Sequence, residues 1–344
     1  MEKYRVGIVG ATGMVGQRFI SLLKDHPWFE VNCVAASARS AGKTYREAVG
    51  ERWAFAWEIP EKVAGMTVVD AADIDEVSKH VDFVFCAVDM KKDEIRALEE
   101  AYAKHEIPVV SNNSACRGIE DVPMVVPEIN ADHLAVIEAQ KKRLGTKSGF
   151  IAVKPNCSIQ SYVPALTPLL DFEPEKVSVC TYQAISGAGK TFKTWPEMVD
   201  NVIPYIGGED EKSENEPLKL WGHVEDGKIV NAALPVISAQ CLRVACSDGH
   251  MAAVSVSFKK KPTIEQIKER WANYETEAQR LELPSAPKPF LQYFEDPSRP
   301  QTRLDRDFQN GFGVSIGRLR EDKLFDYRFV CLSHNTVRGA AGGG

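Results

Sequence analysis

Apolar runs separated by amphipathic stretches dominate the first part of the chain. Several short runs rich in valine and isoleucine have the length of buried strands. The predicted strands are Tyr4–Val9, Glu30–Ala36, Val81–Val88, Ile107–Ser111 and Phe150–Val153, and the clearest predicted helix is Asp93–Lys104. Strands that alternate with helices at this spacing are typical of βαβ units. The first ~150 residues therefore predict a doubly wound α/β domain with a parallel sheet.

The pattern changes after Phe150. The strands predicted there are longer and alternate between apolar and polar residues: Lys176–Ile185, His250–Lys259, Gly313–Leu319 and Phe325–Leu332. This alternation predicts an extended, largely antiparallel sheet with one covered face. One long helix is expected over Thr263–Leu281, with Thr263 as the N-cap and Gln266 completing a capping box. The proline-rich residues Glu282–Pro300 are expected to form an ordered surface excursion.

Composition narrows the class of protein. The chain has 344 residues, of which 44% are hydrophobic and 26% charged, and its formal net charge is −6. These values are typical of a two-domain enzyme and argue against a disordered chain, a disulfide scaffold or a nucleic-acid binder with a broad basic face. No apolar run is long enough for a membrane span and no signal peptide precedes the first strand, so a cytoplasmic location is expected. The eight cysteines form no Cys-x-x-Cys pair, and no metal site is expected.

The turn after the first predicted strand has the residues of a dinucleotide site. Gly10-Ala11-Thr12-Gly13-Met14-Val15-Gly16 has a G-x-x-G-x-x-G spacing between a strand and a helix. Its glycines would let the backbone approach a phosphate, and the helix N-terminus would offer free N–H groups; a merely structural turn is the alternative. The second strand ends without a carboxylate, whereas Ser37, Arg39, Ser40 and Lys43 supply hydroxyls and cations. This pattern favours NADP over NAD, because a 2′-phosphate needs such partners.

One cysteine departs from the expectation of a small buried apolar group. Cys157 lies in Lys154-Pro155-Asn156-Cys157-Ser158, between the strand Phe150–Val153 and a helical pattern over Ser158–Leu170. Backbone N–H groups and the helix dipole stabilise a thiolate at such a junction, and Asn156 could contribute polar contacts to an oxyanion. A thiolate nucleophile needs a proton partner, and His250 at the start of an alternating strand is the candidate histidine. A strand-end histidine without a catalytic role is the alternative.

Two arginines are candidates for binding an anionic substrate. Arg117 follows the predicted strand Ile107–Ser111, in the crevice beyond the carboxyl ends of a parallel sheet. Arg243 lies in the apolar stretch Leu242-Arg243-Val244, where a guanidinium usually has a carboxylate partner or an anionic ligand. A surface Arg117 and an internally paired Arg243 remain the alternatives.

The full set of motifs resembles the aspartate-β-semialdehyde dehydrogenase family, in its archaeal and fungal-type branch. The matching segments are spread over nearly the whole length, and their combination is far more specific than any one of them. They are Gly10–Gly16, Ser111–Arg117, Pro155–Ser158, Tyr182–Gly189, Arg243-Val244, Asp248–His250 and Ser333–Gly342.

The resemblance implies an activity. It is the NADP-dependent reductive dephosphorylation of 4-aspartyl phosphate to L-aspartate 4-semialdehyde, in the biosynthesis of lysine, threonine, methionine and isoleucine. In the family's pattern Cys157 forms the thioester, His250 is the general acid/base and Gln183 orients the thioacyl group. The substrate and phosphate would be bound by Arg243, Arg117, Asn113, Glu209 and Lys212. Glu209 is favoured over Asp210 and Glu211 as the acid that pairs with Lys212.

The resemblance also implies the cofactor contacts and the domain organisation. The expected fold is a Rossmann-type doubly wound nucleotide domain plus an α+β catalytic and dimerisation domain with a large mixed sheet. Residues 1–155, completed by 333–344, would bind NADP, and residues 156–332 would form the second domain. A homodimer or homotetramer is expected, with no nucleic-acid or membrane partner. The residues expected to contact NADP are Gly10, Thr12, Gly13, Met14, Val15, Ser37, Arg39, Ser40, Cys86, Ser114, Ser186, Gly187 and Asn335.

Other functions are compatible with parts of this pattern. Malonyl-CoA reduction would use the same cysteine, histidine and NADPH on the same scaffold, with CoA rather than phosphate as the leaving group. An N-acetyl-glutamyl-phosphate reductase is a more distant alternative. A non-catalytic NADP-binding sensor is disfavoured, because it would have no use for Cys157, Gln183, Arg243 and His250 together.

Overall fold

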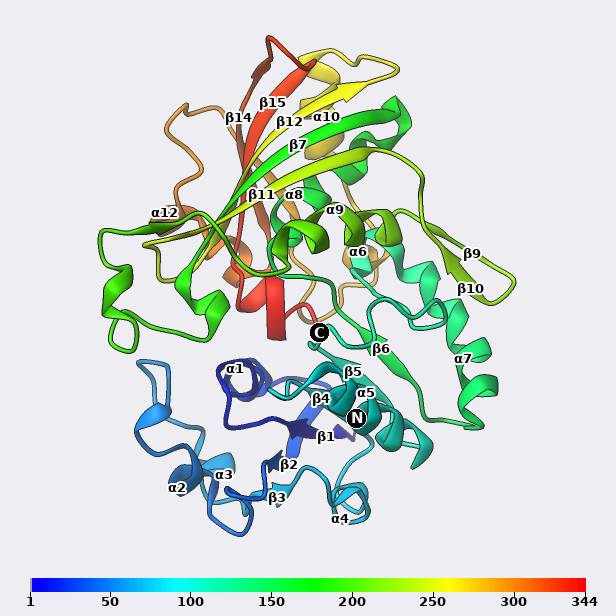
Figure 1. Ribbon diagram of the computed structural model, residues 1–344, viewed down its shortest axis with the longest axis vertical. Coiled ribbons are helices and arrows are strands. Elements are labelled where there is room, and N and C mark those ends of the chain that lie inside the picture. The colour runs from blue at the N-terminus through cyan, green and yellow to red at the C-terminus, as the bar shows by residue number, and fades with distance from the viewer. Residues whose placement is uncertain (1) are drawn as a thin grey trace.

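The computed structural model describes residues 2–344 and contains a six-stranded parallel sheet in its N-terminal part (Figure 1). The strand order is β3-β2-β1-β4-β5-β6, which is the doubly wound order of a nucleotide-binding sheet. The strands are β1 Tyr4–Val9, β2 Phe29–Ala36, β3 Val69–Asp70, β4 Phe83–Cys86, β5 Val109–Ser111 and β6 Ile151–Val153. The five predicted strands are thereby confirmed, whereas the two-residue strand β3 is too short for its pattern to be recognised.

Short helices connect these strands. They are α1 Met14–Leu23, α2 Tyr45–Val49, α3 Glu61–Ala64, α4 Ile74–Ser78, α5 Lys92–Lys104, α6 Pro127–Asn130 and α7 Ile137–Leu144. The predicted helix Asp93–Lys104 corresponds to α5. The apolar side chains of α1, including Phe19 and Ile20, pack against the sheet in a cluster with Val6 and Ile8. This packing fixes the start of α1 directly beyond the end of β1.

A second, seven-stranded sheet forms the upper half of the molecule in Figure 1, in the order β13-β14-β15-β12-β7-β11-β8. Its strands are β7 Pro174–Gln183, β8 Val202–Ile203, β11 Val236–Val244, β12 His250–Phe258, β13 Leu291–Phe294, β14 Val314–Glu321 and β15 Tyr327–Ser333. Two pairs, β11 with β7 and β13 with β14, are parallel, and the others are antiparallel. The sheet is therefore mixed and largely antiparallel. A separate hairpin joins β9 His223–Glu225 to β10 Lys228–Val230.

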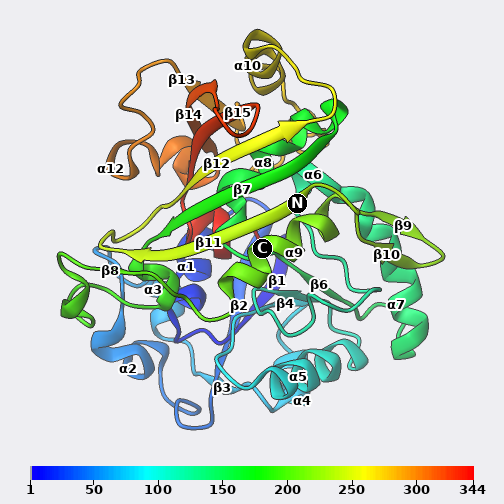
Figure 2. The ribbon, with the colours of Figure 1, turned by 45° about the horizontal axis from the view of Figure 1, so that its top comes forward.

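Helices cover one face of this second sheet. Figure 2 shows β11, β7 and β12 side by side, with α9 beneath β11. The helices are α8 Ile159–Leu166, α9 Glu209–Leu220, α10 Ile264–Ala272, α11 Glu277–Arg280 and α12 Thr302–Asp305. The strands accordingly alternate between buried and accessible positions, as β12 does along its whole length. Among residues 2–344, no helix combines the length and apolar character needed to cross a membrane.

Two predictions in this half were wrong in detail. The single helix expected over Thr263–Leu281 is broken: α10 ends at Ala272, and Thr276 opens α11 with its own capping box to Gln279. The capping box of Thr263 and Gln266 is confirmed. The surface excursion expected over Glu282–Pro300 contains a strand, because Leu291–Phe294 extends the sheet in parallel with β14.

The end of the chain returns to the first sheet. After β15, a π turn at Val337–Ala341 packs against α1 and α8, in red between the two sheets of Figure 1. The guanidinium of Arg338 donates to both carboxylate oxygens of Glu128 in α6, at 2.9 and 2.5 Å, and both side chains are buried. This segment therefore packs between the two sheets, against α1 and α8. The boundary at residue 155 stays a prediction.

Candidate active site

The turn between β1 and α1 opens into a cavity of about 830 Å³. Gly10 has φ = +89°, and a Cβ there would lie 2.3 Å from the carbonyl oxygen of Ala87, so only glycine fits. Gly13 is the N-cap of α1 and provides no capping side chain, so Met14 and Val15 begin a helix whose first N–H groups are available to an anion. The turn therefore has the free donors and the open backbone that a dinucleotide pyrophosphate requires.

Cations and hydroxyls line the far end of this cavity. Ser37, Arg39 and Ser40 lie there, together with Lys43 and Arg52. Asp70 and Asp89 also line it, so the three cations outnumber the carboxylates. This charge balance suits a 2′-phosphate, which carries more negative charge than a ribose hydroxyl. The sequence pattern did not indicate Arg52, because the η1 turn (Gly50–Arg52) after α2, rather than the end of β2, brings it to the cavity.

The second sheet gathers three predicted side chains at one end. Arg243 on β11 is in register with Gln183 on the neighbouring β7. His250 begins β12, whose next residue pairs with the residue before Gln183. All three side chains are buried. Parallel and antiparallel pairing thus bring together residues that are up to 67 positions apart in the sequence.

Cys157 faces this end of the sheet from the junction of β6 and α8. Its Sγ lies 3.4 Å from Nε2 of His250. The loop is fixed by Asn156, whose Oδ1 accepts hydrogen bonds from the backbone N–H and the hydroxyl of Ser158 at 2.8 and 2.7 Å. Gly339 closes the other side, since a Cβ there would lie 2.9 Å from the Cβ of Cys157. The predicted nucleophile and its predicted proton partner are therefore in contact.

The charges around Cys157 act in opposite directions on its thiol. Burial and the carboxylate of Glu209 raise the pKa of Cys157, whereas Lys154, Arg243 and Arg117 lower it. The net effect is a raised pKa. The three cations therefore supply the electrostatic support for a thiolate, and a bound anion or a lost cation would change it directly.

Lys154 is a functional candidate that was not among the residues predicted from the sequence. Its side chain is buried and its ammonium donates to the carbonyl of Pro155 at 2.5 Å. Burial first, and then the charge of Arg117, lowers the pKa of Lys154 to about 7. A lysine directly after a buried strand and three residues before a candidate nucleophile was the signal available in the sequence.

A buried polar cluster lies behind the nucleophile. The carboxylate of Glu209, at the start of α9, accepts from the amide of Asn156 (3.0 Å to each oxygen), from Gln183 (3.2 Å) and from the ammonium of Lys212 (2.8 Å). Burial raises the pKa of Glu209, but Lys212 and the two amides outweigh it, and the net pKa is lowered. Glu209 is thus the acid paired with Lys212, whereas Asp210 accepts from the backbone of Cys241.

Arg117 is held by a carboxylate and by its own loop. Its Nη1 donates to Glu216 at 2.9 Å, and the other oxygen of Glu216 accepts from the backbone N–H of Asn156 at 2.5 Å. The buried ammonium of Lys219 donates to the carbonyls of Arg117 and Ile119, both at 2.7 Å. One carboxylate therefore connects the predicted phosphate-binding arginine to the loop of the nucleophile. No local sequence pattern indicated Glu216 or Lys219 as part of the site.

Arg243 is the second anion-binding candidate. Its Nη1 donates to the carbonyl of Ala184 at 2.7 Å, and burial lowers its pKa. Gly187 lies against it, since a Cβ there would be 2.9 Å from Nη1. No carboxylate partner of Arg243 is found among residues 2–344, so the internally paired alternative does not apply within the part of the chain that the structure describes.

The remaining predicted residues lie around this cluster with varied contacts. Asn335 donates to the hydroxyl of Ser186 at 2.9 Å and accepts from the N–H of Gly249 at 2.8 Å, so it reaches the loop before His250. The amide of Asn113 instead donates to the buried Glu99 at 2.9 Å and to the sulfur of Cys86 at 3.4 Å. Its assignment to phosphate therefore stays a prediction.

Ser114 also lies near the predicted phosphate site, but through its backbone: its carbonyl accepts from the N–H of Arg117 at 3.4 Å. No group of three or more potential metal ligands was found within residues 2–344.

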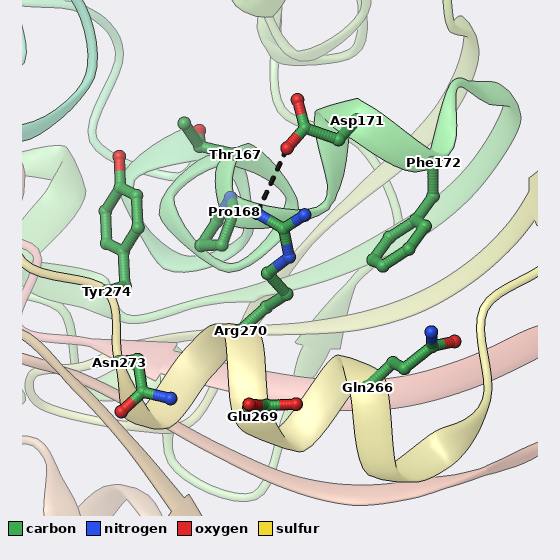
Figure 3. A pocket seen from close by; sticks show the side chains of 9 residues that line it. All are labelled: Thr167, Pro168, Asp171, Phe172, Gln266, Glu269, Arg270, Asn273 and Tyr274. Atoms are coloured by element: carbon green, nitrogen blue, oxygen red, sulfur yellow. Dashed lines mark ion pairs between the residues drawn. The ribbon is translucent and has the colours of Figure 1, made fainter.

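A second groove lies away from the nucleophile, between the η3 turn (Thr167–Phe172) and α10 (Figure 3). The ion pair of Arg270 and Asp171, at 3.0 Å, crosses it, and both side chains are largely exposed. None of its lining residues belongs to the cluster around Cys157. Geometry therefore favours the Cys157 cluster as the active site.

Comparison with protein families gives two matches that together cover most of the chain. Residues 5–137 match the NAD binding domain of semialdehyde dehydrogenase, and residues 166–338 match its dimerisation domain.

Individual relatives agree with these matches. An aspartate-semialdehyde dehydrogenase of Schizosaccharomyces pombe is 45% identical over 347 residues, covering 99% of this chain and 95% of the relative. One of Archaeoglobus fulgidus is 43% identical over 342 residues, with the same coverage. The crystal structure of the aspartate semialdehyde dehydrogenase of Candida albicans with NADP superposes with a TM-score of 0.89 at 38% identity, covering 99% of this chain and 96% of that one.

Proposed function

The chain belongs to the aspartate-semialdehyde dehydrogenase family, and we propose from that membership which of its residues carry the reaction. The enzyme is an NADP-dependent dehydrogenase that converts 4-aspartyl phosphate to L-aspartate 4-semialdehyde and phosphate. Malonyl-CoA reduction is not favoured, because the curated relatives over nearly the full length have the aspartate-semialdehyde name.

Cys157 is the nucleophile in this proposal. Its thiolate attacks the acyl carbon, the bond to the phosphate oxygen breaks, and a thioester forms on the sulfur. Arg117 and Lys212 meet the charge of the departing phosphate. The observation that carries the proposal is the 3.4 Å contact between Sγ of Cys157 and Nε2 of His250 at the sheet end that also holds Gln183 and Arg243.

The residues around the thioester have separate tasks. Gln183, fixed by Glu209, orients the thioacyl group, and Arg243 binds the α-carboxylate of the substrate. When bound, NADPH would supply the hydride needed to reduce the thioester carbon. His250 interacts with the oxygen of the resulting hemithioacetal. The hemithioacetal then releases the aldehyde and regenerates Cys157.

The cofactor would lie along the turn from Gly10 to Val15, with the 2′-phosphate beside Ser37, Arg39 and Ser40. Ser186, Gly187 and Asn335 would approach the nicotinamide end from the second sheet. In this arrangement residues 1–155 and 333–344 form the NADP-binding domain and residues 156–332 the catalytic domain. Cys86 would lie below the cofactor rather than in direct contact, because it is almost fully buried.

We further propose a homodimer, or a homotetramer built from it, that forms through the accessible face of the second sheet. That face exposes Tyr182 on β7, Val236 on the neighbouring β11 and Val202 on β8 beside it. Exposed apolar side chains on neighbouring strands are costly in a monomer and are typical of an interface. A cytoplasmic location fits the substrate and the reduced cysteines of this enzyme.

The reverse reaction tests the function directly. Aspartate semialdehyde and NADP⁺ are mixed with the protein, and NADPH absorbance is followed with and without inorganic phosphate. Phosphate-dependent NADPH formation that is lost in Cys157→Ala is expected. Full turnover by Cys157→Ala would refute the nucleophile assignment, and turnover without any dependence on phosphate would refute the acyl-phosphate route.

A further inference from the structure

The hydrogen bonds of His250 determine which of its nitrogens carries a proton. The backbone N–H of Ala184 points at Nδ1 at a distance of 3.0 Å. A backbone N–H can only donate, so Nδ1 must present a lone pair. A neutral imidazole with a free lone pair on Nδ1 carries its proton on Nε2, which is the nitrogen 3.4 Å from Sγ of Cys157.

The orientation of the ring is also fixed. A 180° rotation about the Cβ–Cγ bond would put carbon atoms where the two nitrogens now meet Ala184 and Cys157. The side chain is fully buried, and Gly187 packs against it, since a Cβ there would lie 3.0 Å from both Cε1 and Nε2. The ring therefore has little room to move away from this pair of contacts.

Several neighbouring groups disfavour the doubly protonated imidazolium form of His250. A proton on Nδ1 would face the N–H of Ala184. Burial lowers the pKa of His250 well below its usual value, and the neighbouring basic groups Arg243, His334 and Lys154 lower it further. The carbonyl of Gly249 acts in the opposite direction. The facing groups thus come from β11, from the segment after β15 and from the loop after β6.

We propose that the N–H of Ala184 fixes His250 as the neutral Nε2–H tautomer, and that His250 works as a hydrogen-bond donor to the sulfur and to the hemithioacetal oxygen rather than as the acceptor of the thiol proton. Ala184 is then a positioning residue that acts through its backbone. The inference deepens the proposed function and rests on it for the identity of the oxygen.

The reduction balances without a proton on Nδ1. Attack by the thiolate breaks the acyl carbon–oxygen bond, whose electron pair leaves with phosphate, and phosphate takes from solvent the one proton that the overall reduction consumes. Once the thioester carbon has accepted a hydride, its oxygen is an alkoxide, which the Nε2–H stabilises. Collapse of the alkoxide breaks the carbon–sulfur bond and returns the electron pair to sulfur as thiolate. The thiol of Cys157 gives its proton to solvent once, before the first turnover, and the thiolate is then recovered in every cycle, so His250 needs only to donate a hydrogen bond.

Nitrogen NMR on the ligand-free protein tests the tautomer without any turnover. Long-range ¹H–¹⁵N correlation spectra of protein labelled at histidine are recorded from pH 5.5 to 8.5, and the His250 signals are assigned by their loss in His250→Gln. The expected result is a protonated Nε2 and an unprotonated Nδ1 that do not titrate between pH 6 and 8. A proton on Nδ1, or a His250 titration within that range, would overturn the proposal.

Two variants separate hydrogen-bond donation from proton transfer. The amide of His250→Gln can place an N–H near the position of Nε2 but cannot act as an acid or base, whereas His250→Leu lacks a donor. Loss of an oxyanion donor typically lowers kcat by about 10²–10³-fold, so we expect that loss in His250→Leu but only about a tenfold loss in His250→Gln. Equal losses in two variants that bind NADPH like the unmodified enzyme would contradict donation as the role.

Failure of the proposed function and failure of the donor role of His250 give different experimental results. If the unmodified enzyme shows no phosphate-dependent turnover, the proposed function is wrong, whatever the ring nitrogens show. If turnover is phosphate-dependent and His250 carries a proton on Nδ1, only the donor role is wrong.

Discussion

Substitution of Lys154 tests whether a buried charge that lowers the stability of the folded protein also makes Cys157 more reactive. The lysine is buried, donates one hydrogen bond to the carbonyl of Pro155, and lies among the charges that act on Cys157. We expect Lys154→Met to make the folded protein more stable and the nucleophile less reactive. Methionine has a similar length and no charge, so the substitution removes the ammonium with little change in volume.

The magnitude follows from the pKa of Lys154, which is lowered from 10.5 to about 7. Because a tenfold change in proton affinity corresponds to about 1.4 kcal/mol, the charged lysine destabilises the folded state by about 4–5 kcal/mol. The lost hydrogen bond to Pro155 offsets about 1 kcal/mol of that gain. A net stabilisation of about 3 kcal/mol near pH 7 is therefore expected for Lys154→Met.

The lowered pKa of Lys154 also determines in which direction the stability of the folded protein changes with pH. Between pH 7 and 10.5 the unfolded chain keeps the lysine proton, whereas the folded chain has released it. The unfolded state then binds more protons, so the stability of the unmodified protein rises with pH through this window. Lys154→Met lacks this rise, and its advantage should be largest at or below about pH 7 and shrink toward pH 10.

Chemical unfolding at about pH 7 and 9.5 measures both effects, with the denaturation midpoint and slope followed separately. Lys142→Met, at an exposed position of α7, is the matched control and should change neither value appreciably. The pH at which iodoacetamide alkylates Cys157 should move upward in Lys154→Met, since one of three supporting cations is gone. A variant that is less stable at pH 7, or whose advantage does not depend on pH, would refute the argument.

Three further outcomes are expected. Arg39→Ala should weaken NADPH binding by about 10–100-fold and leave NADH binding nearly unchanged, as measured by fluorescence titration; equal losses would put the 2′-phosphate site elsewhere. Glu216→Gln should lower the KM for phosphate, because it frees the charge of Arg117; a higher KM would mean that the ion pair holds Arg117 in its binding position. Glu128→Gln should cost about 3–5 kcal/mol in urea unfolding, because it leaves the buried Arg338 unpaired, and an unchanged midpoint would contradict a structural role for that pair.

The fold was predictable where a local pattern determines it. β1 was predicted residue for residue, and the capping box of Thr263 and Gln266 was recognised from side-chain type and spacing alone. The break after Ala272 was missed, because the apolar periodicity continues across it and only the capping contact of Thr276 with Gln279 reveals a new start. The edge strand Leu291–Phe294 was missed for a similar reason: proline-rich flanks indicate a loop, and the pairing with β14 depends on residues far along the chain.

The candidate site was predictable only in part. Cys157 and His250 were identifiable because each sits at the boundary of a recognisable element, although they are 93 residues apart. Glu216 was not, because on the helix α9 it looks like any exposed acid, and its role comes from contacts with Arg117 and Asn156, 99 and 60 residues away. Arg52 and Lys219 were missed on the same grounds. Contacts between residues far apart in the sequence make these ordinary charged residues part of the site. The local sequence pattern does not reveal such contacts.

The charges of the site are arranged for a substrate with two anionic ends. Arg117 and Lys212 are each paired with a carboxylate, whereas Arg243 and Lys154 donate to backbone carbonyls. Two of the four cations therefore already have a carboxylate partner, whereas Arg243 and Lys154 keep their charge for the thiolate and the α-carboxylate of the substrate. A phosphate that enters beside Arg117 must compete with Glu216, whose other oxygen accepts from the backbone N–H of Asn156, next to Cys157. Phosphate binding and the position of the nucleophile are thus coupled through one side chain, so a substitution that frees Arg117 should also alter the reactivity of Cys157.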